Sequence, residues 1–310
     1  METIAGLGLR RVLELLETSG VAFNSGPFNI SVQSDIPSIA DHLFTLYSGY
    51  PLVDDSGFID FYISLDASTG LRRYIRPQVI FSHDGFTPFT PLPLNQAPAQ
   101  FEWGLNWCVA SHAHQFMIIH SAVLEKDGFS IIMPGAPGSG KSTLCAALVV
   151  NGWRLLSDEM ALLSLDDMLL QPVPRPVSLK NRSIDIIRSY APDFYFGKTI
   201  HGTTKGDIRH MKVPQSSIQQ QDKKPPVSIC IFPRYQIEVR PGWELKDKAS
   251  SCMLLIQNIF NFNILGKQGF QAVTDLIEQI NSYAIFYPGL DQAVKLIDRI
   301  VAEETSNGSS

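Results

Sequence analysis

The chain has 310 residues, of which 45% are hydrophobic and 18% charged, and its formal net charge is −5. This composition provides a sizeable core and excludes a globally disordered chain, and no long run of Lys or Arg favours nucleic acid as a partner. No apolar run reaches the roughly 20 residues that span a bilayer, and the N-terminus does not match a signal peptide. We therefore expect a cytoplasmic protein of about two domains, with its four cysteines as buried free thiols.

The first part of the chain predicts a small α+β domain. "METIAGLGLRRVLELLETSG" has apolar residues at helical spacing, and "SIADHLFTLYSGY" is typical of a helix closed by Gly49. "FIDFYISL" and "PQVIFSHDGFTPF" favour strands. The proline-rich "TPFTPLPLNQAPAQ" and the helical "QFEWGLNWCVASHAH" follow, so we place the N-terminal domain at residues 1–110.

The second part predicts a larger α/β domain, at residues 111–303. "QFMIIHSAVLE", "KDG" and "FSIIMPG" form a hairpin, a helix covers 142–151, and "WRLLSDEMALLSL" and "SICIFPRY" are strand-like. Two helices at 249–265 and 268–281, a short strand at 283–287 and a helix at 290–302 complete the domain. We expect residues 304–310 to form a disordered tail.

The segment "GAPGSGKS" matches the G-x-x-x-x-G-K-[ST] pattern at every fixed position, between a predicted strand and a predicted helix. Glycines let backbone N–H groups converge on phosphate oxygens, and the helix N-terminus adds positive potential. The pattern therefore predicts binding of a nucleoside triphosphate, in which Lys141 reaches the outer phosphates and Ser142 ligates Mg²⁺. The predicted nucleotide-binding residues are Gly135, Ala136, Pro137, Gly138, Ser139, Gly140, Lys141, Ser142 and Thr143.

Two adjacent acids, Asp158 and Glu159, follow the apolar "WRLL". In a nucleotide-binding fold of this kind, an acid at the end of a neighbouring strand faces the metal ion or the attacking nucleophile. A solvated turn is the alternative for this pair, and it is the expectation for Asp166 and Asp167. His120 ends the apolar "FMII" one strand before the glycines, where a lone histidine is ordinarily a core residue.

The order "H-S-A-V … G-x-x-x-x-G-K-S-T … G-W-R-L-L-S-D-E" resembles the catalytic domain of HPr serine kinase/phosphorylase over roughly residues 115–185. The resemblance implies a compact P-loop α/β domain with a mixed sheet, shared with phosphoenolpyruvate carboxykinases. It implies that Asp158 is the base that deprotonates a substrate serine, that His120 lies nearby, and that Glu159 supports the metal. The E-x-R-G-L-G signature of that family is absent, and "PRPVSLKNRS" stands in its place, so the resemblance does not extend to the phosphorylase reaction or to HPr as substrate.

Over nearly its whole length the chain resembles the group called HprK-related kinase A. The shared segments are "LYSGYPL", "FEWGLNWC", "MPGAPGSGKSTLCAAL", "GWRLLSDE", "PRPVSLKN" and "FPRY". Genes of that group occur in bacterial loci for exopolysaccharide export and exosortase protein sorting. The resemblance supplies no substrate.

Other polar residues give weaker signals. "SHAH" followed by His120 suggests a metal site through His112 and His114, although no further ligand stands at a fixed spacing. The loop "HGTTKGDIRH" is either a solvated surface or a phosphate contact through Lys205 or Arg209. Further candidates for contacts with phosphate or substrate, with salt bridges as the alternative, are Arg175, Lys180 and Arg234.

Together these features predict a kinase that uses ATP and Mg²⁺ to phosphorylate a hydroxyl on a protein, a peptide or a small molecule. The alternative is a nucleotide-dependent assembly module without transfer chemistry, which would need the glycines but neither Asp158 nor His120. A GTPase lacks support, because no N-K-x-D-type guanine motif is present. Whether the chain forms a homo-oligomer is left open.

Overall fold

The chain is a mixed α/β protein, seen in a computed structural model that describes residues 2–54, 56–136 and 138–308. It divides into two compact units. Unit 1 comprises Met1–His112, Arg175–Asp185 and Asp193–Gln219, and unit 2 comprises Ala113–Pro174, Ile186–Pro192 and Gln220–Ser310. Two segments from the second half of the chain therefore belong to unit 1, although the predicted boundary at residue 110 assigns them to the other domain.

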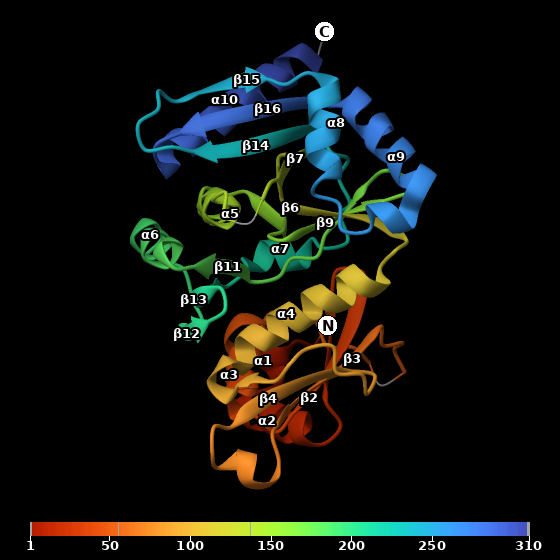
Figure 1. Cartoon of the computed structure of the whole chain (residues 1–310), viewed down its shortest axis with the longest axis vertical. Helices are drawn as coiled ribbons and strands as arrows, with labels where there is room; N and C mark the ends of the chain where they lie inside the picture. The colour runs from red at the N-terminus through yellow and green to blue at the C-terminus, as the bar shows by residue number, and fades with distance from the viewer. Residues whose placement is uncertain (1, 55, 137, 309–310) are drawn as a thin grey trace. The chain divides into compact units, whose positions relative to one another are not determined.

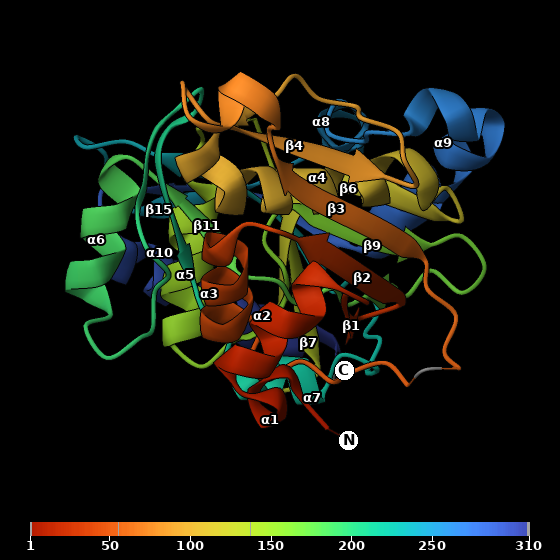
Figure 2. The same ribbon diagram turned by 90° about the horizontal axis from the view of Figure 1, so that it is seen from below.

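Unit 1 contains a sheet with strand order β1-β2-β3-β4-β5 and a smaller one with order β11-β13-β12. The larger sheet is mixed, because β2 and β3 are parallel to each other whereas the other neighbouring strands of this sheet pair antiparallel (Figure 2). Its strands are β1 (Val21–Ser25), β2 (Phe28–Ser34), β3 (Phe61–Ala67), β4 (Gln78–His83) and β5 (Leu92–Pro93). The smaller sheet contains β11 (Val177–Lys180), β12 (Ile200–Thr203) and β13 (Gly206–Met211).

The helices of unit 1 enclose an aromatic core. Phe23, Tyr47, Tyr50 and Phe101 are almost fully buried, and their rings contact one another. The helices are α1 (Ile4–Leu7), α2 (Leu9–Glu17), α3 (Pro37–Leu46), α4 (Ala97–His112) and α7 (Gln215–Gln219), with 3₁₀ turns η1 (Gly70–Arg73) and η2 (Leu94–Gln96). Helix α6 (Arg182–Tyr190) begins in unit 1 and ends in unit 2.

A carboxylate, Glu102 of α4, is buried inside unit 1. It accepts a hydrogen bond from Tyr47 Oη at 2.8 Å, lies 2.8 Å from His42 Nε2 and forms an ion pair of 3.8 Å with Arg175. Burial acts to raise the pKa of Glu102, but the hydrogen bond with His42 and the charges of Arg175 and His210 outweigh it, lowering the pKa to about 2. Glu102 is therefore a buried anion that depends on partners from distant parts of the sequence.

Unit 2 is built on a sheet with order β10-β9-β6-β7-β14-β16-β15, in which β8 also pairs with β6 (Figure 1). β6 is antiparallel to β7, β8 and β9, whereas β14 is parallel to both β7 and β16. The strands are β6 (Phe116–Lys126), β7 (Phe129–Pro134), β8 (Arg154–Ser157), β9 (Met160–Ser164), β10 (Leu170–Gln171), β14 (Ile229–Tyr235), β15 (Gly242–Leu245) and β16 (Asn281–Tyr287).

The helices of unit 2 cover this sheet. They are α5 (Lys141–Val150), α8 (Lys248–Ile256), α9 (Phe262–Gln279) and α10 (Leu290–Gly308). Helix α10 packs against α5 and β16, and α8 packs against α9 (Figure 1). The apolar side chains of α8, α9 and the strands form a common core, including Met117, Ile132, Leu156, Val273 and Leu276.

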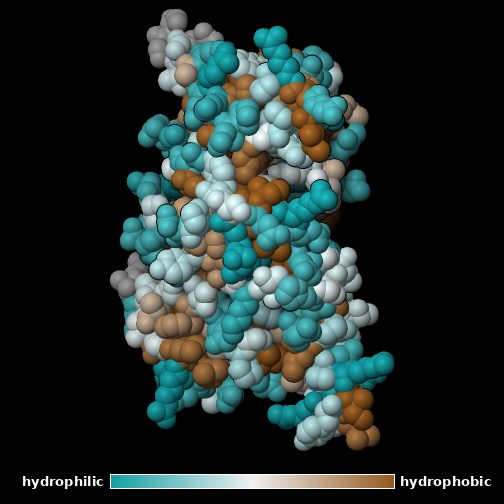
Figure 3. All heavy atoms as spheres, turned by 90° about the vertical axis from the view of Figure 1, so that its left-hand side faces the viewer, coloured by the Kyte–Doolittle hydropathy of each residue, from teal (hydrophilic) through white to brown (hydrophobic). Residues whose placement is uncertain are grey.

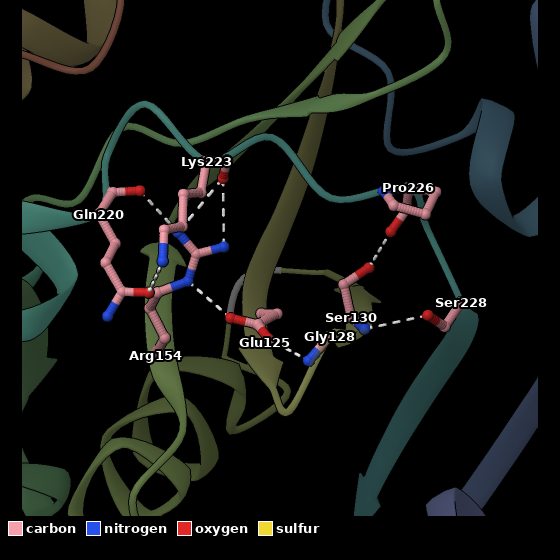
Figure 4. Close-up of polar contacts among 8 residues, drawn as sticks. All are labelled: Glu125, Gly128, Ser130, Arg154, Gln220, Lys223, Pro226 and Ser228. Carbon is pink, nitrogen blue, oxygen red and sulfur yellow. Dashed lines mark hydrogen bonds and ion pairs between the residues drawn. The ribbon is translucent and has the colours of Figure 1, made fainter. Parts of the chain in front are cut away.

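One end of β6 is fixed by a buried arginine (Figure 4). Arg154 Nε donates to Glu125 Oε2 at 2.7 Å, and its Nη1 donates to the carbonyl oxygens of Gln220 and Lys223 at 2.8 and 3.2 Å. The guanidinium thereby joins β8, β6 and the chain that leads into β14. Because each of the three guanidinium nitrogens has an acceptor, the buried charge is compensated.

Three predicted helix boundaries in unit 2 were wrong. The helix predicted from residue 268 begins at Phe262. The helix predicted at 249–265 ends at Ile256, because residues 257–261 leave the helix and bond to β6. The last helix continues to Gly308, past its predicted end, because Glu304 accepts hydrogen bonds from Asn281 and Tyr283 of β16. The expected disorder from residue 304 is therefore wrong for the described part of that tail.

Candidate active site

A glycine loop, residues 135–140, joins β7 to α5, as the sequence predicts. Gly138 and Gly140 have φ angles of +84° and +89°, in the left-handed region that glycine adopts without strain. Gly140 is the N-cap of α5 and carries no side chain that could cap the helix. The N-terminus of α5 therefore presents backbone N–H groups and positive potential to an anion.

The side chains of the loop fit a phosphate ligand. Lys141 is buried, and its Nζ donates to the carbonyl oxygens of Gly135 and Ala136. Ser139 Oγ is also buried and has no hydrogen-bond partner among the described residues. A bound phosphate would supply acceptors for both groups. Ser142 and Thr143 occupy the first turn of α5, half-buried, whereas Pro137 lies outside the described residues.

The strand register brings the predicted acids and His120 to the start of the glycine loop. Asp158 and Glu159 connect β8 to β9, and both strands pair with β6. His120 lies opposite Met160 on one edge of β6, and Ser121 lies opposite Pro134 on the other edge. Residues opposite each other in a sheet have Cβ atoms about 4.5–5.5 Å apart. At this level of the sheet, the connection between β8 and β9, the strand β6 and the end of β7 therefore lie side by side.

Asp158 also contacts α5, the helix that begins in the glycine loop. It is 6% exposed and shares a hydrogen bond with the Cys145 thiol. Burial, followed by the charge and hydrogen bond of Asp158, raises the pKa of this thiol well above its usual value. Glu159 is half-buried, and its carbonyl oxygen accepts from Ser121 N at 3.2 Å. Asp158 is therefore enclosed, not the solvated turn residue of the alternative interpretation.

His120 is positioned by the connection between α8 and α9, which sequence reasoning missed. Its backbone N–H donates to Asn258 O at 2.6 Å, and its ring lies 5.5 Å from the ring of Phe260. Asn261 is 1% exposed, accepts from Ile118 N at 3.0 Å and donates to Phe116 O at 2.8 Å. The amide of Asn261 thus completes the backbone bonding of β6 just before His120.

Two tyrosines adjoin the glycine loop on the side of β14 and β16. A Cβ atom on Gly140 would lie 3.6 Å from Tyr287 Oη and 4.0 Å from Tyr235 Cβ. Tyr287 is buried, and this burial, together with Tyr235, raises its pKa. Arg234 is exposed beside Tyr235 at the end of β14. Of the five basic candidates, Arg234 is the one in the same unit as the glycine loop.

The other four basic candidates lie in unit 1, where each has local contacts. Arg209 Nε donates to Gly197 O at 2.8 Å. Arg175 pairs with Glu102 and donates to Asn106. Lys205 Nζ lies 5.0 Å from the centroid of the Trp103 ring. The backbone of Lys180 pairs with Ile208 in the small sheet.

The polar residues around the glycine loop suit a Mg²⁺ ion that is held partly by the phosphates of a nucleotide. They do not form a site that would hold a metal ion by protein side chains alone. Mg²⁺ is usually held by one or two carboxylates, water and substrate phosphates, and Ser142, Asp158 and Glu159 offer such a set. Within the described ranges, no group of three or more His, Cys, Asp and Glu residues is arranged to hold a metal ion. The rings of His112 and His120 instead contact aromatic neighbours, Trp107 and Phe260 respectively.

Comparisons with known proteins give matches among solved structures alone. No family model matches the chain. No curated protein matches its sequence either. Among solved structures, it is similar to the Hpr(Ser) kinase/phosphatase from Coxiella burnetii, at 16% identity and a TM-score of 0.32, over 62% of this chain and 99% of that one. At this TM-score the likeness does not establish a shared fold, so membership of the HprK-related group stays a prediction.

Proposed function

We propose that this protein is an ATP-dependent kinase that transfers the γ-phosphoryl group to a hydroxyl, with a serine of a protein or peptide as the preferred acceptor. The proposal is carried by the arrangement in which His120, the pair Asp158–Glu159 and the start of the glycine loop meet across β6. A nucleotide-binding module alone would need the glycines but no enclosed acid beside them.

We assign each of these residues a role from its position relative to the glycine loop. Magnesium ATP, when bound, supplies the phosphoryl group. The loop glycines and Lys141 hold its phosphates, and Ser142 and Glu159 hold the metal ion. Asp158 accepts the proton of the acceptor hydroxyl. His120 orients that carboxylate or contacts the transferred phosphate, and Arg234 offers positive charge at the same side of the glycine loop.

A polypeptide acceptor is supported by exposed apolar side chains on α8, α9 and the connection between them. Phe260, whose ring is tilted by 32° against that of His120, is 54% exposed. Met253 of α8 and Ile264 and Phe270 of α9 are exposed by 52–64%. Several exposed large apolar residues on neighbouring elements are typical of a protein-binding surface, and Phe260 connects them to His120. A sugar or a lipid intermediate carrying a hydroxyl is the competing acceptor.

The decisive variant is Asp158→Asn, with Asp166→Asn as its matched control in an exposed turn of the same unit. Labelled ATP is incubated with the protein and a lysate of its own cells. We expect the Asp158 variant to bind ATP but to lose transfer by roughly 10²–10⁴-fold, since the amide cannot accept a proton. The control should transfer at the wild-type rate.

The stability of the product bond in acid separates a hydroxyl acceptor from a carboxylate or a histidine. A phosphoserine survives acid, whereas an acyl phosphate or a phosphohistidine does not. Equal transfer by wild type and Asp158→Asn would refute the assigned base. Label released as inorganic phosphate alone, without a labelled acceptor, would instead support the nucleotide-dependent assembly module.

A further inference from the structure

The connection between β3 and β4 ends in a tip of exposed apolar side chains. Leu71 is 81% exposed, Tyr74 83% and Ile75 66%. They belong to the segment Gly70–Arg76, here called the basic tip. This connection is the orange loop at the lower end of Figure 1, and Figure 3 shows hydrophobic and hydrophilic spheres side by side at that end. Exposed apolar side chains gathered in so short a segment indicate a binding surface.

The basic tip is held in shape at its base. Ser68 N donates to Gln78 O at 2.8 Å, and Gln78 N donates to Ser68 Oγ at 3.1 Å. Arg72 Nη1 also donates to Gln78 Oε1 at 2.6 Å. The 3₁₀ turn η1 then reverses the chain, with left-handed φ angles at Gly70 and Arg76. The apolar side chains therefore project from an ordered turn and do not fold back onto the sheet.

Charge distinguishes this tip from an ordinary apolar patch. Arg72, Arg73 and Arg76 alternate with the apolar residues, and all three are exposed. No Asp or Glu occurs between Asp66 and Asp84, although the whole chain carries a net charge of −5. Ion pairs within the described residues do not involve these arginines. The basic tip is therefore a positively charged surface segment on a protein whose net charge is negative.

We propose that the basic tip inserts into the surface of a membrane that contains anionic lipids. Apolar side chains that enter the boundary between headgroups and acyl chains, with arginines at the phosphates and a tyrosine at the interface, are the chemistry of peripheral membrane binding. The tip is convex and short, whereas a stable protein interface buries about 800 Å² on each partner. The observations thus favour a lipid surface over a folded protein.

Binding through the tip is reversible and depends on salt. No helix in the described part of the chain is long and apolar enough to cross a bilayer, so the tip acts as a surface contact. Each arginine near an anionic surface contributes about fivefold in affinity, and screening by salt reduces that contribution.

Flotation with vesicles tests the proposal on the full chain. Vesicles of phosphatidylcholine with 30% phosphatidylglycerol are compared with pure phosphatidylcholine at low and high salt. We expect binding to the anionic vesicles, weakened at least tenfold in Arg73→Gln/Arg76→Gln and lost in Leu71→Ser/Ile75→Ser. The matched control is Arg182→Gln/Arg188→Gln, which removes the same charge from exposed positions on α6 and leaves binding within twofold of wild type.

Three results would overturn the proposal. They are no binding of the wild-type chain to anionic vesicles, binding that neither tip variant weakens, and an equal loss in the α6 control. Capture of a protein that depends on the tip, without vesicle binding, would assign the tip to a protein partner. Thermal unfolding reports the folding of the variants. The basic tip lies in unit 1, outside the candidate active site of unit 2, so unchanged ATP binding by calorimetry separates this test from that of the kinase.

Discussion

The thiol of Cys145, in the second turn of α5, donates a hydrogen bond to the carboxylate of Asp158, between β8 and β9. This contact joins the helix that begins at the glycine loop to the acid that we assign as the base. A shift of α5 on phosphate binding would therefore be transmitted to the carboxylate. The relationship arises from the sheet, because β6 pairs with the strands on both sides of Asp158.

Cys145→Ala should slow transfer without weakening ATP binding. A thiol is a weak donor, and its loss leaves the carboxylate in place but less firmly oriented, so we expect a decrease in kcat of about threefold to tenfold. The matched control is Cys230→Ala, which removes another buried thiol, one that interacts with Ser282. Both variants should lose similar thermal stability. An equal decrease in kcat for both would show that packing, and not the contact with Asp158, matters.

Lys141→Ala should abolish most ATP affinity. The ammonium group is already oriented by the carbonyl oxygens of Gly135 and Ala136, so it meets an incoming phosphate at little entropic cost. Isothermal titration calorimetry with magnesium ATP should show at least a tenfold weaker Kd. The control is Lys126→Ala, which changes a partly exposed lysine at the C-terminal end of β6. Unchanged affinity in a folded Lys141 variant would contradict the nucleotide site.

Glu102 should make unit 1 sensitive to acid. Its pKa of about 2 in the folded chain lies below the ordinary value of 4.5, so ionised Glu102 stabilises the fold above pH 4.5. This contribution, on the order of 3 kcal/mol, is lost as the pH falls from 4.5 towards 2. Urea unfolding of wild type and Glu102→Gln should therefore differ most at pH 7 and converge in acid.

The control for this pH dependence is Glu238→Gln, an exposed acid in unit 2. Its free energy of unfolding should follow that of wild type at every pH. A difference between wild type and Glu102→Gln that stays constant from pH 7 to pH 3 would show that the pKa of Glu102 is not lowered in the folded state.

The local elements of the site could be predicted because their signals are local. The glycine loop follows from Gly138, Gly140 and Lys141 in a strand–loop–helix sequence, and the structure has this strand and helix. The turn at Asp166 is also exposed, as predicted. Such features depend on neighbours a few residues away, so a single sequence contains the evidence for them.

The contacts that position the site could not be predicted. Asn261 bonds to residues 143 and 145 positions earlier, and Tyr287 reaches the loop from the end of a later strand. The apolar spacing predicted that the helix continues through residues 257–261. The sequence around these residues does not show that their backbone groups bond to β6 instead. For Arg175 the sequence left a phosphate contact and a salt bridge open, and in the fold it pairs with Glu102, since a positive charge in the sequence does not identify its counter-ion.

The route of the chain between the units limits how the protein can be divided. A fragment ending at His112 would lack Arg175–Asp185 and Asp193–Gln219, and with them the small sheet whose Ile200 and Ile208 cover Ala99 of α4. It would also leave Glu102 buried without Arg175 and His210. Proteolytic cleavage after α4 should therefore not release a folded N-terminal piece. The sequence suggests that the first 110 residues form a domain of their own. In the structure, this domain is completed by residues that are synthesised after the glycine loop.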